Sequence, residues 1–327
     1  MKLTELTTPA LVVDSAILDE NLRIMTKALP GERLRPHVKA HKCSALARRQ
    51  AEAGHKTFCC ATVREMEGLA RAGLGHDLML ANEVVDARRL GALDARVTVA
   101  VDSPETVVAA ADGGVREVVV DINIGLPRCG CPPDQAGRIA DLARGRGLEV
   151  RGVMGYEGHV MGQTDPVERA ALTEKAMELL LGAHAQTGGE VISAGGTCTY
   201  AINTWATEIQ AGTYALMDTA YTYEDMPFQP AFWLLATVIS VSGAYAVADA
   251  GLKSLGMDHG NPTIDGAKVW FCSDEHITFA PEQPVRVGER VRVWPAHVDP
   301  TIAYHERLHL TDGEDVTDVW EVDLRGW

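Results

Sequence analysis

Strand and helix signals alternate along the first two thirds of the chain, and this alternation limits the possible folds more than any other feature. Short apolar runs are separated by longer stretches with helix-like spacing of apolar residues, which is typical of an α/β protein. The runs are apolar throughout, as expected for strands buried on both faces of a parallel sheet. We expect strands at residues 34–40, 56–62, 77–80, 97–101, 117–124, 149–156, 191–194 and 208–210. Eight such strands predict a (β/α)8, TIM-like barrel.

The pattern changes from about Trp233, where β segments become closely spaced and are separated by glycine and proline turns. This change predicts a second domain, mostly antiparallel β, at the C-terminal end. The 327 residues suffice for a barrel of about 250 residues and a smaller domain. We expect the barrel to span residues 15–232 and the β domain to include residues 233–327.

Composition excludes several functional classes. The formal net charge of −15 argues against a nucleic-acid surface, where basic residues would cluster. The seven cysteines are an odd number without the paired spacing of a zinc site, which favours free thiols in a reducing compartment. No apolar run reaches about 18 residues, and the N-terminus lacks the pattern of a signal sequence. We therefore expect a cytoplasmic protein that binds neither nucleic acid nor membrane.

Lys39 lies where the first expected strand ends, in the sequence His37-Val38-Lys39-Ala40-His41. In (β/α)8 barrels, active-site groups lie at the carboxyl ends of the strands. A lysine there can hold an aldehyde cofactor through a covalent bond to its amine. Alone, this lysine is weak evidence, because most lysines are solvated surface charges.

Two turns of small residues follow the seventh and eighth expected strands, at residues 193–197 and 212–214. Small residues let backbone N–H groups approach an anion closely. Either turn alone is more often an ordinary tight turn. Phosphate sites in barrels are frequently built from these two loops together, so the pair predicts a cofactor that carries a phosphate.

A His-x-Asp triplet, His297-Val298-Asp299, lies in the second domain, on a segment that we expect to be a strand. On a strand, residues two apart point to the same face, so His297 and Asp299 could bind one cation together. An imidazole and a carboxylate suit Mg²⁺, Mn²⁺ or Zn²⁺ without selecting one of them. Such triplets are common, and most are structural.

Residues 35–42 resemble the cofactor-lysine motif of the fold-type III pyridoxal-phosphate enzymes. In particular, the chain resembles the D-threonine aldolase and eukaryotic-type D-serine dehydratase family, from Thr8–Asp14 at one end to Val319–Trp320 at the other. The resemblance implies an alanine racemase-like fold in which residues 1–14 join the β domain. It also implies that Lys39, rather than Lys42, binds pyridoxal 5'-phosphate. Enzymes of this architecture are commonly dimers, so we expect a homodimer.

The resemblance implies further site residues. Arg128, in a pattern Asp…Gly…Arg-Cys-Gly, would lie near the phenolic oxygen of the cofactor, although it could also be a surface arginine. Tyr156 could face the pyridine ring or pack as ordinary core, and His159 is placed for acid/base work or for a structural role. His297 and Asp299 would be the metal ligands. The phosphate loops would contribute Gly195, Gly196, Thr197, Gly212, Thr213 and Tyr214.

These residues together predict a lyase that needs pyridoxal phosphate and a divalent metal. We expect an aldolase that cleaves D-β-hydroxy-α-amino acids, of the D-threonine or D-3-hydroxyaspartate type, to glycine or an analogue and an aldehyde. A D-serine or D-3-hydroxyaspartate dehydratase is the alternative, because the same groups could remove the Cα proton and the hydroxyl. A metal-free amino-acid racemase would leave His297 and Asp299 without a purpose. A non-catalytic cofactor-binding protein would not need the extra β domain.

Overall fold

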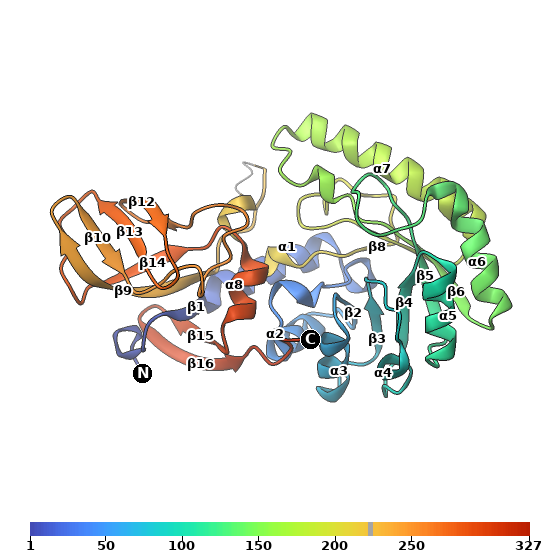
Figure 1. Ribbon diagram of the computed structural model, residues 1–327, viewed down its shortest axis with the longest axis horizontal. Helices are drawn as coiled ribbons and strands as arrows, with labels where there is room; N and C mark the ends of the chain where they lie inside the picture. The colour runs from blue at the N-terminus through green and yellow to red at the C-terminus, as the bar shows by residue number, and fades with distance from the viewer. Residues whose placement is uncertain (222–224) are drawn as a thin grey trace. The chain divides into compact units, whose positions relative to one another are not determined.

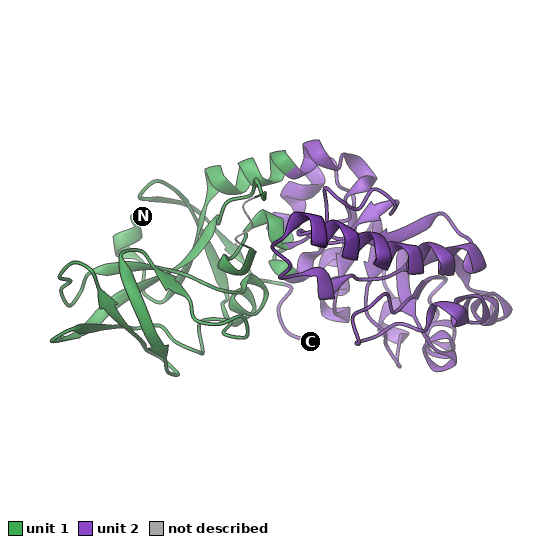
Figure 2. Ribbon diagram, turned by 90° about the horizontal axis from the view of Figure 1, so that it is seen from above, with its two compact units in different colours: residues 1–24, 40–45, 213–323 green, residues 25–39, 46–212, 324–327 purple. Residues whose placement is uncertain are grey.

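The computed structural model describes residues 1–221 and 225–327. The chain divides into two compact units, which Figure 2 shows in different colours. Unit 1 contains residues 1–24, 40–45 and 213–323, and unit 2 contains residues 25–39, 46–212 and 324–327. Among the described residues, no helix combines the length and the apolar character that a membrane-spanning helix requires.

Unit 2 is built, within the described part of the chain, on a parallel sheet of seven strands that follow one another in chain order (Figure 1). The strands are β2 (Thr57–Cys60), β3 (Asp77–Leu80), β4 (Val97–Val101), β5 (Glu117–Asp121), β6 (Glu149–Met154), β7 (Val191–Ala194) and β8 (Glu208–Ile209). The helices before and between these strands along the chain are α1 (Ser15–Ala28), α2 (Ser44–Glu52), α3 (Val63–Arg71), α4 (Arg88–Gly91), α5 (Pro104–Asp112), α6 (Ala136–Gly145) and α7 (Pro166–Thr187). Most of α1 belongs to unit 1, and the other helices lie wholly or mainly in unit 2. The predicted alternation of strands and helices is thereby confirmed.

Capping side chains explain where several of these helices begin. The Thr62 hydroxyl accepts the backbone N–H of Glu65 at the start of α3. Ser103 does the same for α5, and Asp165 does so for α7. Each cap satisfies N–H groups that have no partner inside the helix. The caps therefore stabilise the start of each of these helices, where the loop after the preceding strand ends.

The segment before Lys39 differs from the predicted strand at residues 34–40. It pairs with β8 and with β2 through isolated bridges, Leu34 with Ile209 and His37 with Cys59. The backbone then turns, and Val38–Ala40 forms a short 3-10 helix, η3. Pro36 has no N–H to donate to a sheet ladder, which is one reason why this segment forms bridges rather than a continuous strand.

Unit 1 contains, among the described residues, a sheet of nine strands in the order β10-β13-β12-β11-β14-β9-β1-β15-β16. An additional pairing of β10 with β9 closes part of this sheet into a barrel. The strands are β1 (Ala10–Asp14), β9 (Phe232–Ser242), β10 (Tyr245–Ala248), β11 (Thr263–Ile264), β12 (Ala267–Cys272), β13 (Ile277–Pro281), β14 (Arg290–Trp294), β15 (Arg307–Asp312) and β16 (Asp315–Glu321). The pairing is antiparallel except between β1 and β15. The predicted antiparallel β domain is confirmed, and β1 belongs to its sheet.

The segment that carries His297 and Asp299 is not a strand, so this prediction was wrong. Strand β14 ends at Trp294, and helix α8 (Val298–Tyr304) begins directly after His297. His297 has extended backbone angles at the N-cap position, and Asp299 lies in the first turn. Pro300 is compatible with this first turn, because the first N–H groups of a helix need no partner within it.

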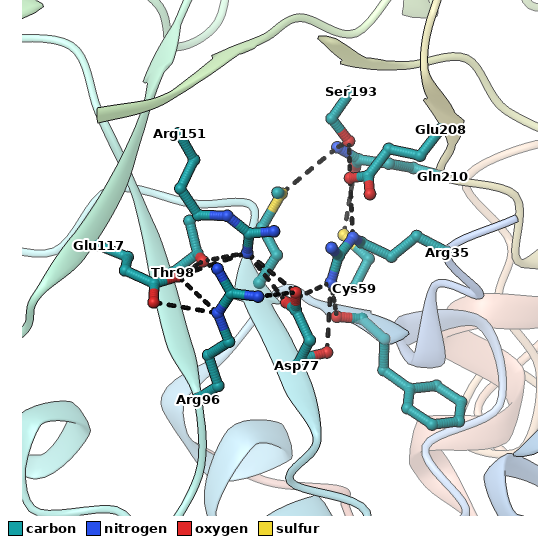
Figure 3. A network of polar contacts seen from close by, with 12 residues as sticks. Arg35, Cys59, Asp77, Arg96, Thr98, Glu117, Arg151, Ser193, Glu208 and Gln210 are labelled. Atoms are coloured by element: carbon teal, nitrogen blue, oxygen red, sulfur yellow. Dashed lines mark hydrogen bonds and ion pairs between the residues drawn. The ribbon is translucent and has the colours of Figure 1, made fainter. Parts of the chain in front are cut away.

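A network of buried polar side chains fills part of the interior of unit 2 (Figure 3). At its centre, the Arg35 guanidinium contacts Glu208 at 2.7 Å and Asp77 at 3.0 Å. Arg151 contacts the same Asp77 at 3.0 Å and donates a hydrogen bond to Thr98. Arg35 is only 1% exposed, so these charges compensate one another away from water.

The network connects the strands of the sheet. Ser193 of β7 donates to Glu208 of β8, and Gln210 donates to Ser193. The Cys59 thiol of β2 in turn contacts the Gln210 side chain, at 3.1 Å. Burial alone would raise the pKa of Asp77, but the charge and hydrogen bond of Arg35, with Arg151, hold it below its usual value. The network thus anchors residues 34–37, the segment that leads to Lys39.

Candidate active site

Lys39 lies in η3, directly beyond the segment that bridges β8 and β2. Its side chain is half-buried, and its backbone N–H faces the buried His37 ring, with 3.5 Å between nitrogen and Nδ1. Lys42 comes after the turn and has a left-handed backbone, with φ of 46°. Lys39 therefore follows a segment that pairs with two strands of the parallel sheet, as predicted. It lies on a 3-10 turn, however, and not at the end of a continuous strand.

Arg128 and Tyr156 are brought together, although they follow different strands. The Arg128 guanidinium carbon lies 5.6 Å from the centre of the Tyr156 ring, within the range of a cation–π contact. Gly196 lies against the same ring: a Cβ atom on Gly196 would be 3.5 Å from the Tyr156 ring edge. Two of the predicted cofactor residues, Arg128 and Gly196, therefore lie against the ring of a third, Tyr156, beyond the carboxyl ends of β5, β6 and β7.

Glu157 organises the loop after β7, and the sequence analysis missed it. Its carboxylate is buried, and it accepts hydrogen bonds from the Gly195 N–H at 3.0 Å, the Thr199 hydroxyl at 2.9 Å and the Asn203 amide at 3.2 Å. Gly196 donates its own N–H to the Thr199 hydroxyl. Gly195 and Gly196 thus shape the loop, because their N–H groups have partners within the protein. The only signal in the sequence was the acidic residue next to Tyr156.

His159 is exposed and lies beside Gly125. A Cβ atom on Gly125, which has φ of 135°, would be 2.5 Å from the His159 ring. The imidazole is therefore held against the loop that carries Arg128. Nearby, burial and the neighbouring Glu83 raise the pKa of the Asp121 carboxyl at the end of β5.

Thr213 and Tyr214 begin a 3-10 turn, η6 (Thr213–Ala215), in unit 1, while Gly212 ends a segment of unit 2. The Tyr214 side chain is 1% exposed, and its ring packs on Phe228 with centroids 5.8 Å apart. Its ring is thus part of the core.

The start of helix α8 in unit 1 carries the predicted metal ligands. Asp218 accepts the N–H of Val298 at 2.8 Å and so provides the cap that the His297 side chain does not. Burial raises the pKa of Asp218 to about 7, and Asp299 contributes to the rise. Burial also lowers the pKa of His297, although Asp299 and Asp258 oppose this. His297, Asp258 and His259 have potential ligand atoms that all lie within 4.8 Å of one another.

Comparison with known families accounts for both parts of the chain. Residues 13–219 match the family described as the alanine racemase N-terminal domain, and residues 231–311 match the putative serine dehydratase domain. A D-threonine aldolase from Arthrobacter sp. is 32% identical over 99% of this chain and 94% of its own length. The chain belongs to the D-threonine aldolase and D-serine dehydratase family. It is therefore an alanine racemase-like, fold-type III member, as the resemblance implied.

Two further family members are similar along nearly their whole length. A 3-hydroxy-D-aspartate aldolase from Paracoccus denitrificans (strain Pd 1222) is 30% identical over 99% of this chain and 93% of its own length. The crystal structure of D-threonine aldolase from Filomicrobium marinum has a TM-score of 0.94 and 32% identity, and covers 100% of this chain and 98% of that one. The family fold thus extends over both units of this chain.

Proposed function

We propose that this chain is an aldolase that uses pyridoxal 5'-phosphate and a divalent metal to cleave D-β-hydroxy-α-amino acids. The products are glycine, or an analogue, and an aldehyde. The observation that carries the proposal is the similarity to a D-threonine aldolase over 99% of the chain, in both units. The 3-hydroxy-D-aspartate aldolases support the same reaction on an acidic side chain.

A panel of D-amino acids tests this proposal directly. We expect D-threonine or D-3-hydroxyaspartate to yield glycine and the matching aldehyde, and the corresponding L-amino acids to remain intact. Glycine, aldehyde and ammonia should be measured separately, because ammonia with a keto acid would indicate the dehydratase alternative. Interconversion of D- and L-alanine without cleavage would instead show a racemase.

The residues at the carboxyl ends of the parallel strands fit pyridoxal phosphate. Lys39 would hold the cofactor covalently, Arg128 would lie near its phenolic oxygen and Tyr156 would face its ring. The Tyr156 ring and Gly196 support this fit, since a side chain at Gly196 would narrow the space beside the ring. The phosphate would bind at the loops that contain Gly195, Gly196, Thr197, Gly212, Thr213 and Tyr214. When bound, the cofactor supplies an electron-withdrawing ring to the amino group of the substrate.

The start of α8 fits a divalent metal ion, with Mn²⁺, Mg²⁺ and Zn²⁺ all compatible with imidazole and carboxylate donors. His297 and Asp299 would be its protein ligands. Such an ion lowers the pKa of a bound hydroxyl group. His159 is proposed to accept the proton of the substrate's β-hydroxyl in the cleavage. In the dehydratase alternative, Lys39 would instead remove the proton from Cα. The similarity to a D-threonine aldolase and to a 3-hydroxy-D-aspartate aldolase supports cleavage over dehydration.

Asp299→Ala should separate metal-dependent activity from cofactor binding. We expect this variant to keep the visible absorbance of the lysine-bound cofactor and to lose D-threonine cleavage by on the order of 10²-fold or more, because the hydroxyl is no longer polarised. Activity with and without added Mn²⁺ measures the effect. Asp141→Ala, an exposed helix residue, serves as control. Cleavage of D-threonine at the wild-type rate, with indifference to chelator, would show that the proposed metal role of Asp299 is wrong.

We further propose three properties of the whole molecule. The pairing of residues 34–37 with both β8 and β2 supports a complete (β/α)8, TIM-like barrel over residues 15–232, with the metal site in the β domain of residues 1–14 and 233–327. A homodimer is supported by an exposed apolar patch on unit 1, around a hollow of about 560 Å³. The patch includes Ile239, Tyr245, Trp270 and Phe271. A cytoplasmic location rests on the composition alone.

A further inference from the structure

We propose that Asp258 and His259 are positioning residues for His297, which they hold in the tautomer and ring orientation that a metal ligand needs. The inference rests on the proposed role of His297 as a ligand of the divalent ion. It adds two residues from a separate loop, between β10 and β11, to the pair at the start of α8.

The backbone brings this loop to the start of α8. Gly256 forms an antiparallel bridge with His297, and its N–H donates to the Thr301 hydroxyl at 2.9 Å. The same hydroxyl donates to the His297 carbonyl oxygen at 2.6 Å. A Cβ atom on Gly256 would lie 2.2 Å from the Pro300 ring, so this close approach requires glycine. The loop is therefore fixed against the helix two residues before Asp258.

Asp258 determines which nitrogen of His297 can bind an ion. Its Oδ2 atom lies 2.7 Å from Nδ1 of His297. A carboxylate oxygen can only accept a hydrogen bond, so Nδ1 carries the proton and Nε2 keeps the lone pair that a metal ion requires. Carboxylate groups play this part beside many metal-binding histidines. Asp258 is more than half exposed, and the contact therefore depends on the backbone of the loop rather than on burial.

His259 covers one face of the same ring. The two imidazoles are stacked, with centroids 3.9 Å apart and only 10° between their planes. The lone pair of an imidazole nitrogen lies in the plane of its ring, and two parallel planes at this separation do not converge on one ion. His259 therefore supports the His297 ring in this arrangement and does not itself act as a ligand. The stack opposes rotation of the His297 ring about its side-chain bonds, and the contact with Asp258 fixes the Nδ1 edge of the ring.

The test uses Mn²⁺ alone, titrated by calorimetry into the purified full-length protein, together with ¹⁵N NMR of the histidine rings before metal is added. Asp258→Ala should weaken Mn²⁺ binding by about 10- to 100-fold and move the His297 proton from Nδ1 to a mixture of tautomers. Asp258→Asn keeps an acceptor oxygen, and so should retain the tautomer and most of the affinity. His259→Phe keeps a stacked ring without a ligand nitrogen, and should bind Mn²⁺ nearly as wild type does.

Three outcomes would overturn the proposal. Loss of Mn²⁺ affinity in His259→Phe equal to that in Asp258→Ala would make His259 a direct ligand. Loss of Mn²⁺ affinity in Asp258→Asn, with the His297 tautomer unchanged, would make Asp258 a direct ligand. If Asp258→Ala has the same Mn²⁺ affinity and the same His297 tautomer as wild type, Asp258 has no role in positioning His297. His276→Phe, at an exposed histidine of unit 1, is the matched control. If wild type binds no Mn²⁺ while its His297 tautomer still depends on Asp258, the proposed metal role of His297 fails and the positioning itself stands.

Discussion

Replacing Lys39 with alanine should abolish amino-acid cleavage and remove the visible absorbance of covalently bound cofactor. The expected loss of activity is on the order of 10³-fold or more, because the cofactor loses its covalent anchor and the site loses an acid/base group. The fold should survive, since Lys39 is only half-buried and its backbone position is fixed by residues 34–37. Absorbance, activity and the unfolding midpoint measure these effects separately.

Lys42→Ala is the matched control, because Lys42 is a half-buried lysine three residues away. We expect Lys42→Ala to keep the absorbance of the bound cofactor. Borohydride reduction of wild type, followed by peptide mapping, should place the label on Lys39. A label on Lys42, with an active Lys39→Ala variant, would show that the assignment of the cofactor lysine is wrong.

Arg35→Met should produce the largest loss of stability among single substitutions in unit 2. The substitution leaves Glu208 without its cation in the protein interior, and removing one partner of a buried ion pair costs about 3–5 kcal/mol. Domains of this kind are stable by only about 5–15 kcal/mol, so most of the folded population could be lost at elevated temperature. Urea unfolding monitored by circular dichroism measures the change. Asp77 still contacts the Arg151 guanidinium in this variant, so we expect the loss of stability to come mainly from the unpaired Glu208.

The double variant Arg35→Met/Glu208→Gln distinguishes the ion pair from simple loss of packing. It removes both charges, and we expect it to recover a substantial part of the stability lost in Arg35→Met. Arg88→Met, which removes an exposed ion pair with Asp86, should leave the unfolding midpoint almost unchanged. A double variant no more stable than Arg35→Met would mean that the pair does not carry the effect.

Much of the architecture could be predicted, because it depends on the local pattern of apolar, polar and turn-forming residues. The strands β3, β4 and β7 have the predicted bounds, since each is a buried apolar run between turn signals. The strand at 34–40 could not be predicted correctly, because its polar residues pair with partners far along the chain. Arg35 contacts Glu208, which is 173 residues away.

The candidate site could likewise be predicted only in part. The spacing of His297 and Asp299 identified them in the sequence, but we predicted a strand there. In the structure, β14 ends at Trp294, directly before Pro295, and α8 begins at Val298. Pro300 in the first turn is a helix-start signal that the interpretation overlooked. Glu157 and His259 could not be identified by spacing, because only tertiary contacts place them beside Gly195 and His297.

The buried network of Figure 3 links the N-terminal part of unit 2, through Arg35, to its last strand, β8, through Glu208. A sheet held only by apolar packing could persist with a strand missing from one end. Here, a fragment that ends before residue 208 would retain Arg35, Asp77 and Arg151 but would lack the second carboxylate that Arg35 contacts. The buried Arg35 guanidinium would then have lost one of its two carboxylate partners, which would oppose the compact state of the fragment. Unit 2 should therefore behave as one cooperative unit rather than as a stack of separable βα repeats, so shortened versions of it would not be viable.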